Sequence, residues 1–346
     1  MVALDPNRRV VTEMWHGQPR VRLATLPTHL ERGPDLAGQS QLWVKRDDLT
    51  GLGMGGNKAR KLEFLCGAAV AAGADCLITV GAGQSNHCRM TAAAGALLGL
   101  EVHLVLAGDR PKVLEGNHLL SDRFGAHQHF TGAGPAEWGL LEIAREDLTE
   151  ELSAQGLKPY SIPVGGSTAI GALGYIVAYQ EIVEQASALN LSPKTIVFTS
   201  SSGGTHAGLV AGRAYLRAHM SALGQTEVLP ELLAIGVAKG VVAGFPSVRE
   251  LAQESLAIAG LPGEVLDEDV EVDARWLGED YAIPTEASRA AITWAAHNGA
   301  WVLDDVYTAK GMAGLLGNAT QGRWASGENV IFIHTGGSPE VFVRHD

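Results

Sequence analysis

Cysteine is scarce in this sequence. Three of the 346 residues are cysteines, and Cys66, Cys76 and Cys88 form neither a CxxC pair nor a spacing with histidine that is typical of zinc sites. The pattern excludes a disulfide framework like that of small secreted proteins. We interpret the three residues as reduced thiols of a cytoplasmic protein.

Basic residues are also few. Lysine and arginine number 26 against 38 aspartate and glutamate residues, which gives a net charge of −12 and a pI near 5.5. Nucleic acids and anionic membranes attract basic surfaces, so neither is expected as a main partner. A small molecule is the expected partner.

Long apolar segments are missing as well. The chain has no run of about 18 uncharged apolar residues, the length that a membrane-spanning helix requires. Residues 1–20 lack the apolar centre of a signal peptide. We therefore expect neither a membrane span nor secretion by the ordinary route.

Glycine, in contrast, is abundant, with 43 residues clustered between apolar runs. The order of strand, glycine-rich turn and helix recurs along the chain, which predicts an α/β fold with parallel strands and helical crossovers. The predicted strands comprise residues 41–46, 76–80, 102–107, 195–199, 229–237, 301–303 and 329–334. The predicted helices include residues 58–72, 88–98, 115–124, 136–157, 171–189, 248–259 and 286–296.

A lysine stands where one of these glycine-rich turns enters a helix. Lys58 follows Gly55, Gly56 and Asn57 directly and opens an amphipathic segment. The helix dipole and nearby cations lower the pKa of such an amine, which can then attack a carbonyl. The alternative is a solvated basic face formed with the next two basic residues, Arg60 and Lys61. We interpret those two as flanking charges.

The segment 200–205 is the clearest predicted anion site. After a strand, it places three serines, two glycines and a threonine at a helix start, where backbone N–H groups can converge on a phosphate. The segment is not a P-loop, because no Gly-Lys-Ser/Thr follows.

A second turn, at residues 81–87, also leads from a strand into a helix. It lacks the third glycine of a dinucleotide-binding motif and has His87 where a serine-hydrolase elbow needs glycine. The turn presents Ser85, Asn86 and His87, which suit a carboxylate or a ring oxygen. N-capping by Ser85 or Asn86 is an alternative that can hold at the same time.

The C-terminal third contains two tyrosines in loops, Tyr281 and Tyr307, for which the spacing alone predicts ordinary packing. The histidines, including His118 and His206, have no partner at ligand spacing. We therefore predict no metal site.

Taken together, these motifs resemble the D-cysteine desulfhydrase and 1-aminocyclopropane-1-carboxylate (ACC) deaminase family of pyridoxal-phosphate enzymes. The resemblance spans nearly the whole chain. It rests on segments 45–51, 55–64, 84–87, 165–167, 171–175, 202–209 and 334–337.

The resemblance implies a two-domain, fold type II enzyme. Each domain would be a mostly parallel twisted sheet flanked by helices. Residues 1–50 plus 165–346 would form a large cofactor-binding domain and residues 51–164 a small domain, because glycine-rich loops near 50 and 165 separate the helical blocks. A homodimer is expected from the family.

The resemblance also implies roles for individual residues. Lys58 would hold the aldehyde of pyridoxal 5'-phosphate and act as the base at the substrate Cα, with Ser85, Tyr281 and Tyr307 as further catalytic residues. The substrate would contact Ser85, Asn86 and His87. The implied cofactor-binding residues are Lys58, Asn57, Asn86, Ser202, Gly203, Gly204, Thr205 and Thr335.

Two departures bear on the substrate. ACC deaminases have glutamate after the second tyrosine and an apolar residue at the position of Thr335, whereas this chain has Thr308 and Thr335. A hydroxyl beside the pyridine nitrogen suits β-elimination, so D-cysteine, yielding pyruvate, sulfide and ammonia, is the first expectation. ACC deaminase, L-cysteate sulfo-lyase and a non-catalytic small-molecule-binding protein stay open as alternatives.

Overall fold

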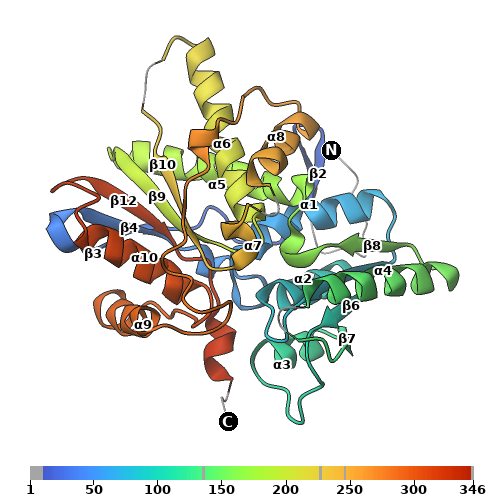
Figure 1. Cartoon of the computed structure of the whole chain (residues 1–346). Coiled ribbons are helices and arrows are strands. Elements are labelled where there is room, and N and C mark those ends of the chain that lie inside the picture. The colour runs from blue at the N-terminus through green and yellow to red at the C-terminus, as the bar shows by residue number, and fades with distance from the viewer. Residues whose placement is uncertain (1–10, 135–136, 226–227, 245–246, 344–346) are drawn as a thin grey trace.

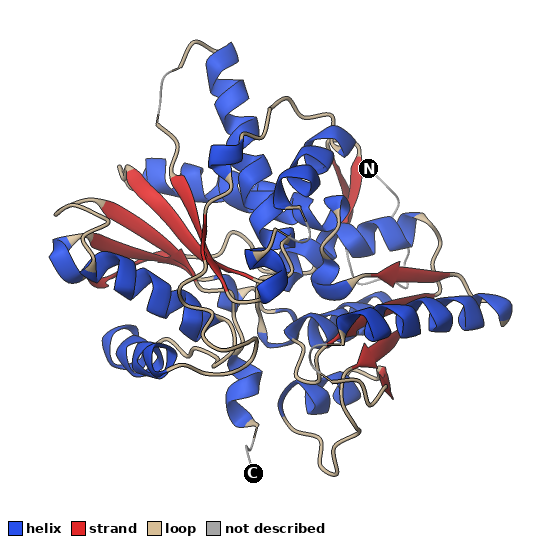
Figure 2. Cartoon of the chain, in the orientation of Figure 1, coloured by secondary structure: helices blue, strands red, loops and turns tan. Residues whose placement is uncertain are grey.

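The computed structural model describes residues 11–134, 137–225, 228–244 and 247–343. Two sheets lie apart in the view of Figure 1, the larger on the left and the smaller on the right, with helices on both faces of each. Figure 2 shows the same alternation of strands and helices along the chain. The predicted α/β class is confirmed.

The large sheet has six strands in the order β11-β10-β9-β12-β4-β3, and every pairing except β3 with β4 is parallel. Its strands are β3 (Leu30–Asp35), β4 (Gln41–Lys45), β9 (Pro193–Ser200), β10 (Glu231–Gly236), β11 (Val272–Asp273) and β12 (Asn329–Ile333). One face packs on α5 (Ala169–Ala188), α6 (Gly204–Ala222) and α8 (Val248–Ile258), and the other on α9 (Glu286–Gly299) and α10 (Thr308–Thr320). Alternate residues of each strand enter opposite cores, as the two-residue period of a strand requires.

The small sheet has four parallel strands in the order β7-β6-β5-β8. These are β5 (Cys76–Gly81), β6 (Glu101–Leu106), β7 (His127–Phe130) and β8 (Pro159–Ile162). Helices α1 (Lys58–Ala71) and α2 (Asn86–Leu98) cover one face, with α3 (Gly116–Arg123) against α2, and α4 (Trp138–Ala154) covers the other. The four strands all lie within residues 51–164, the predicted small domain, and the division of the chain into two domains stays a prediction.

One predicted strand is absent from the structure, and one hairpin was not predicted. Residues 301–303 pair with none of the described strands and so form no strand; Trp301 packs into the core and donates its indole N–H to Glu31. The hairpin β1 (Thr12–Trp15) and β2 (Gln18–Val21) was not predicted. A short helix, α7 (Lys239–Val242), follows β10. The three cysteines are buried and unpaired.

Helix α1 lies between the two sheets and is buried nearly all round, so the interpretation of Arg60 as a flanking surface charge is wrong. The guanidinium of Arg60 donates to Asp47 at 2.8 Å and to Glu181 of α5 at 2.8 Å. The hydroxyl of Tyr175 donates to the same Asp47 at 2.6 Å. Burial acts to raise the pKa of Asp47, but Arg60 holds it below its usual value. The network joins α1 to the large sheet.

No helix among the described residues is both long and apolar enough to cross a lipid bilayer.

We predict that Arg60→Met lowers the free energy of unfolding by about 3–5 kcal/mol, because it leaves the buried carboxylate of Asp47 without the cation that is bonded to it, whereas Glu181 keeps its ion pair with Lys45. The matched control is Arg249→Met, whose guanidinium is half-exposed beside Asp267 and whose loss should cost at most about 1 kcal/mol. Urea unfolding of both variants measures the difference. Equal losses in the two proteins would contradict the buried network.

Candidate active site

Three chain segments from distant parts of the sequence meet at the start of α1. The backbone N–H of Asn57 donates to the carbonyl of Thr335, just after β12, at 2.9 Å. The Asn57 side-chain amide donates to the hydroxyl of Thr205, in the first turn of α6, at 3.0 Å. These bonds place Lys58 at the carboxyl ends of the large-sheet strands, where α/β sheets bind ligands.

Lys58 is the first residue of α1 and its side chain is half-buried. Burial lowers the pKa of its amine to about 8, with Asp304 acting to raise it and Arg89 to lower it further. Its amine donates to Asn57 Oδ1 at 3.3 Å. An amine with this pKa is partly neutral near pH 8 and can act as a nucleophile or a base. From the sequence, the helix dipole and nearby cations are expected to lower the pKa of Lys58, whereas burial is the largest cause in the structure.

The predicted anion loop has the geometry of a cradle. Gly203 adopts a left-handed φ of 82° before α6 begins at Gly204. A Cβ on Gly204 would lie 2.5 Å from Lys61 Nζ and 2.9 Å from Ser167 Cα, so only glycine fits there. The backbone N–H of Gly204 donates to Ser167 Oγ at 3.2 Å, and Ser167 Oγ donates to Ser202 Oγ at 2.9 Å.

Lys61 is part of this cradle, so its interpretation as a flanking charge is also wrong. Its side chain is fully buried and its amine donates to the carbonyl of Gly165 at 2.5 Å. Burial, and then the charge of Lys58, hold the pKa of Lys61 well below its usual value. Among the residues that the structure describes, neither lysine forms an ion pair. Lys58 and Lys61 are three residues apart and therefore lie on one face of α1. This spacing is the sequence signal that could have placed Lys61 in the site.

The turn after β5 contains the next group of predicted residues. Ser85 Oγ accepts the N–H of Cys88 at 3.2 Å, so Ser85 does cap α2. Asn86 Oδ1 accepts from the Asn117 amide at 3.0 Å and from Arg89 at 3.3 Å. Both side chains are half-buried, and that of Asn86 is directed toward Asn117 of α3.

His87 lies deeper than its neighbours and is 3% exposed. Its Nε2 is 2.9 Å from the hydroxyl of Thr79, which itself donates to the carbonyl of Ile162. The imidazole therefore donates from Nε2, and its buried Nδ1 has no hydrogen-bond partner among the described residues. Burial, Lys58 and Lys61 hold the pKa of His87 far below its usual value, so the ring is neutral.

The two predicted tyrosines are brought together although 26 residues separate them. Their hydroxyl groups are in direct contact, and the rings meet edge to face with centroids 5.7 Å apart. Trp138 of α4 packs edge-on against Tyr281 at 6.0 Å, so the small-sheet region also contributes to this corner. Burial raises the pKa of Tyr307, which keeps its phenol protonated at neutral pH.

Glu340 is a residue near this corner that the sequence did not suggest. It lies in a single-turn helix after β12, close enough to Tyr307 to act on the pKa of that phenol. Burial raises the pKa of Glu340 to about 8, with Asp304 and Asp305 adding to the effect. Its Oε2 is buried without a partner among the described residues. A single acid near the C-terminus has no sequence pattern that marks it as functional.

The comparisons with known proteins decide the family. The model of the pyridoxal-phosphate dependent enzyme family matches residues 21–336. The chain belongs to this family. It is 38% identical over 336 residues to the D-cysteine desulfhydrase of Salmonella typhi and 39% identical over 337 residues to that of Klebsiella pneumoniae strain 342. In both cases the match covers 94% of this chain and 96% of the relative.

A solved structure described as an ACC deaminase homologue has the same fold. It is 36% identical, has a TM-score of 0.81 and matches over 94% of each chain. A fungal L-serine ammonia-lyase from Rhizomucor miehei is similar in fold, at 15% identity and a TM-score of 0.63 over 92% of this chain and 95% of that one. The predictions of fold type II and of pyridoxal phosphate as the cofactor are confirmed.

The residues present fit this cofactor. A phosphate would supply the anion that the buried Lys61 lacks, at a loop where a Cβ on Gly204 would fill the space. An aldehyde would meet the amine of Lys58, whose pKa of about 8 leaves part of it neutral. The site thus offers one lysine for the charge of the phosphate and one for covalent attachment.

We predict that Lys61→Met weakens the retention of pyridoxal phosphate about ten- to a hundredfold, the effect of losing one charge-assisted hydrogen bond. Binding of pyridoxal, which has no phosphate, should be unchanged. Equilibrium dialysis of both compounds measures the two affinities, with the exposed Lys112→Met as control. Equal weakening of both compounds would place Lys61 away from the phosphate.

The raised pKa of Glu340 predicts that the stability of the protein depends on pH. Its carboxyl ionises near 4.5 when unfolded and near 8 when folded, so folding takes up a proton between these values. The contribution of Glu340 is fully present below the unfolded pKa and is lost as the pH rises toward 8, by up to about 1.4 kcal/mol per pH unit. Glu340→Gln should flatten this slope in urea unfolding of the holoenzyme, whereas the exposed Glu254→Gln should not. Parallel slopes in all three proteins would contradict the shift.

Proposed function

We propose that the chain is a pyridoxal-phosphate-dependent lyase that eliminates the β-substituent of a small amino acid, with D-cysteine as the first substrate. The products would be pyruvate, sulfide and ammonia. The observation that best supports this proposal is the lowered pKa of the Lys58 amine, at a helix start that Asn57 ties to the anion loop. The named D-cysteine desulfhydrases at 38% and 39% identity support the substrate class.

Pyridoxal phosphate supplies, when bound, a conjugated ring that stabilises negative charge at the substrate Cα. We propose that Lys58 holds the cofactor and then moves the Cα proton, because its amine is partly neutral near pH 8. Asn57 keeps this amine in place through its bonds to Thr205 and Thr335.

The other cofactor contacts follow from the loop geometry. Ser202, Gly203, Gly204 and Thr205 would hold the phosphate together with Lys61, since their backbone N–H groups open α6. In a separate part of the site, Asn86 would face the ring hydroxyl and Thr335 the ring nitrogen. Both side chains are half-buried, as a ligand contact requires.

We propose that Ser85 and Asn86 receive the substrate carboxylate at the start of α2. His87 stays a predicted substrate-binding residue, but only its Nδ1 is available because Nε2 is bonded to Thr79. Tyr281 and Tyr307 would face the leaving group, where a protonated phenol can donate to a departing thiolate.

ACC deamination is the second candidate, and the similarity to a solved ACC deaminase homologue favours it. Thr308 and Thr335 argue against it, because they replace the residues expected of ACC deaminases. The hydroxyl of Thr308 donates to the carboxylate of Asp304 at 2.6 Å and accepts the backbone N–H of Asp304 at 2.8 Å. L-cysteate sulfo-lyase activity and a regulatory protein without catalysis are the further alternatives.

The test incubates the holoenzyme with D-cysteine, L-cysteine, L-cysteate and ACC in parallel and assays keto acid, sulfide and sulfite. We expect pyruvate and sulfide from D-cysteine. Lys58→Ala should abolish turnover and the visible absorption of the bound cofactor, whereas the exposed Lys112→Ala should retain both. Absence of the absorption from the wild-type protein, or full activity of Lys58→Ala, would end the proposal. Release of sulfite or of 2-oxobutyrate instead would identify an alternative.

A homodimer and a cytoplasmic location stay predictions from the family resemblance and the sequence. Light scattering on the purified protein measures the first.

A further inference from the structure

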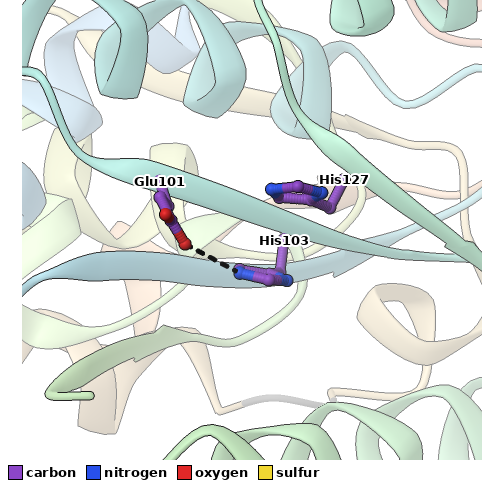
Figure 3. Close-up of side chains that lie close together, drawn as sticks. All are labelled: Glu101, His103 and His127. Atoms are coloured by element: carbon purple, nitrogen blue, oxygen red, sulfur yellow. Dashed lines mark ion pairs between the residues drawn. The ribbon is translucent and has the colours of Figure 1, made fainter.

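Three side chains capable of binding metal gather on the small sheet, outside the site described above. Glu101 and His103 lie on β6, and His127 lies opposite His103 on β7 in parallel register. One ligand atom from each residue lies within 4.8 Å of the others. Figure 3 shows the carboxylate of Glu101 directed at the ring of His103, with the ring of His127 beside it.

The arrangement follows from the strand period. Residues 101 and 103 project from the same face of β6, and the register brings His127 to that face. Neighbours on this face, Ile78 and Val105, pack toward α4. The edge position of β7 leaves His127 exposed, whereas His103 is only 7% exposed.

The buried Nε2 of His103 is in ion-pair range of Glu101 but forms no hydrogen bond with the described residues. The closest Glu101 oxygen is 3.8 Å away. The Nδ1 of His103 is 3.1 Å from Nε2 of His129. When Nδ1 donates to His129, the lone pair of Nε2 is directed toward the carboxylate. A second nitrogen held by a hydrogen bond in this way is typical of metal-binding histidines.

The surroundings of His103 fit a bound cation. His103 is buried, and its ring stacks between those of His127 and His129. Neutral imidazole is the form that binds metals. Ring stacking accounts for the 4.7 Å separation of His103 and His127. Stacking does not account for a buried Nε2 that faces a carboxylate without a hydrogen bond.

We propose that Glu101, His103 and His127 bind a divalent transition-metal ion of the zinc type. Two imidazoles and a carboxylate are ligands that Zn²⁺ accepts, with water in the remaining position. The sequence predicts no metal site, because residues 103 and 127 are far apart in sequence and meet only through the register of β6 and β7. The proposed ion departs from that prediction.

The position of the proposed ion on the small sheet indicates a stabilising role. Glu101 is the first residue of β6, whereas the Ser85 turn follows the opposite end of β5, which pairs with β6 in parallel. The ion therefore lies away from Lys58 and joins the edge strand β7 to β6. Binding to the folded state alone stabilises the protein, and the stabilisation increases with the concentration of free ion.

The test titrates Zn²⁺ into the holoenzyme by calorimetry and follows thermal unfolding with and without the ion. We expect one Zn²⁺ per chain and a higher Tm with the ion. His127→Gln and Glu101→Gln, both at exposed positions, should each lower the affinity at least about tenfold. Their circular dichroism and cofactor absorption should stay unchanged. The control is His297→Gln, an exposed histidine on α9.

Two outcomes would overturn the proposal. One is no binding to the wild-type protein, or equal binding to wild type, His127→Gln and His297→Gln. The other is loss of binding in Cys76→Ser with retention in His127→Gln, which would assign the ion to the thiol of Cys76, close to Glu101 on the neighbouring strand. Neither outcome bears on the lyase activity.

Discussion

The buried position of α1 is the constraint on which the rest of the structure depends. The first four residues of this helix include three basic ones, and the helix lies between two sheets. Each buried charge there requires a counter-charge or hydrogen bonds. Arg60 is neutralised by Asp47 and Glu181, which tie the helix to the large sheet. Lys58 and Lys61 form no such pair among the described residues, and this difference separates the structural cation from the two that face the cofactor.

The site is assembled from loops that end strands of both sheets. Asn57 connects the start of α1 to the loops after β9 and β12, so the lysine and the anion cradle are held as one unit. The tyrosine pair comes from the C-terminal third of the chain and contacts Trp138 of α4.

The small sheet has different chemistry at its two ends. The carboxyl end of β5 leads to the Ser85 turn, and the other end of β6 begins with the acid of the histidine cluster. Parallel pairing produces this separation, because all strands start at one edge and finish at the other. Ligand chemistry at one edge can thus coexist with a stabilising ion at the other.

The sequence by itself determined the parts that local chemistry controls: the α/β class, Lys58 at a helix start, and the Ser202–Thr205 loop, because glycine, small hydroxyl residues and helix termini act over a few residues. Only the tertiary structure decided what is buried. It placed Arg60 and Lys61 inside, joined Tyr281 to Tyr307, put Glu340 beside them and paired His103 with His127. These relations depend on strand register and sheet packing between distant segments, which no local pattern specifies.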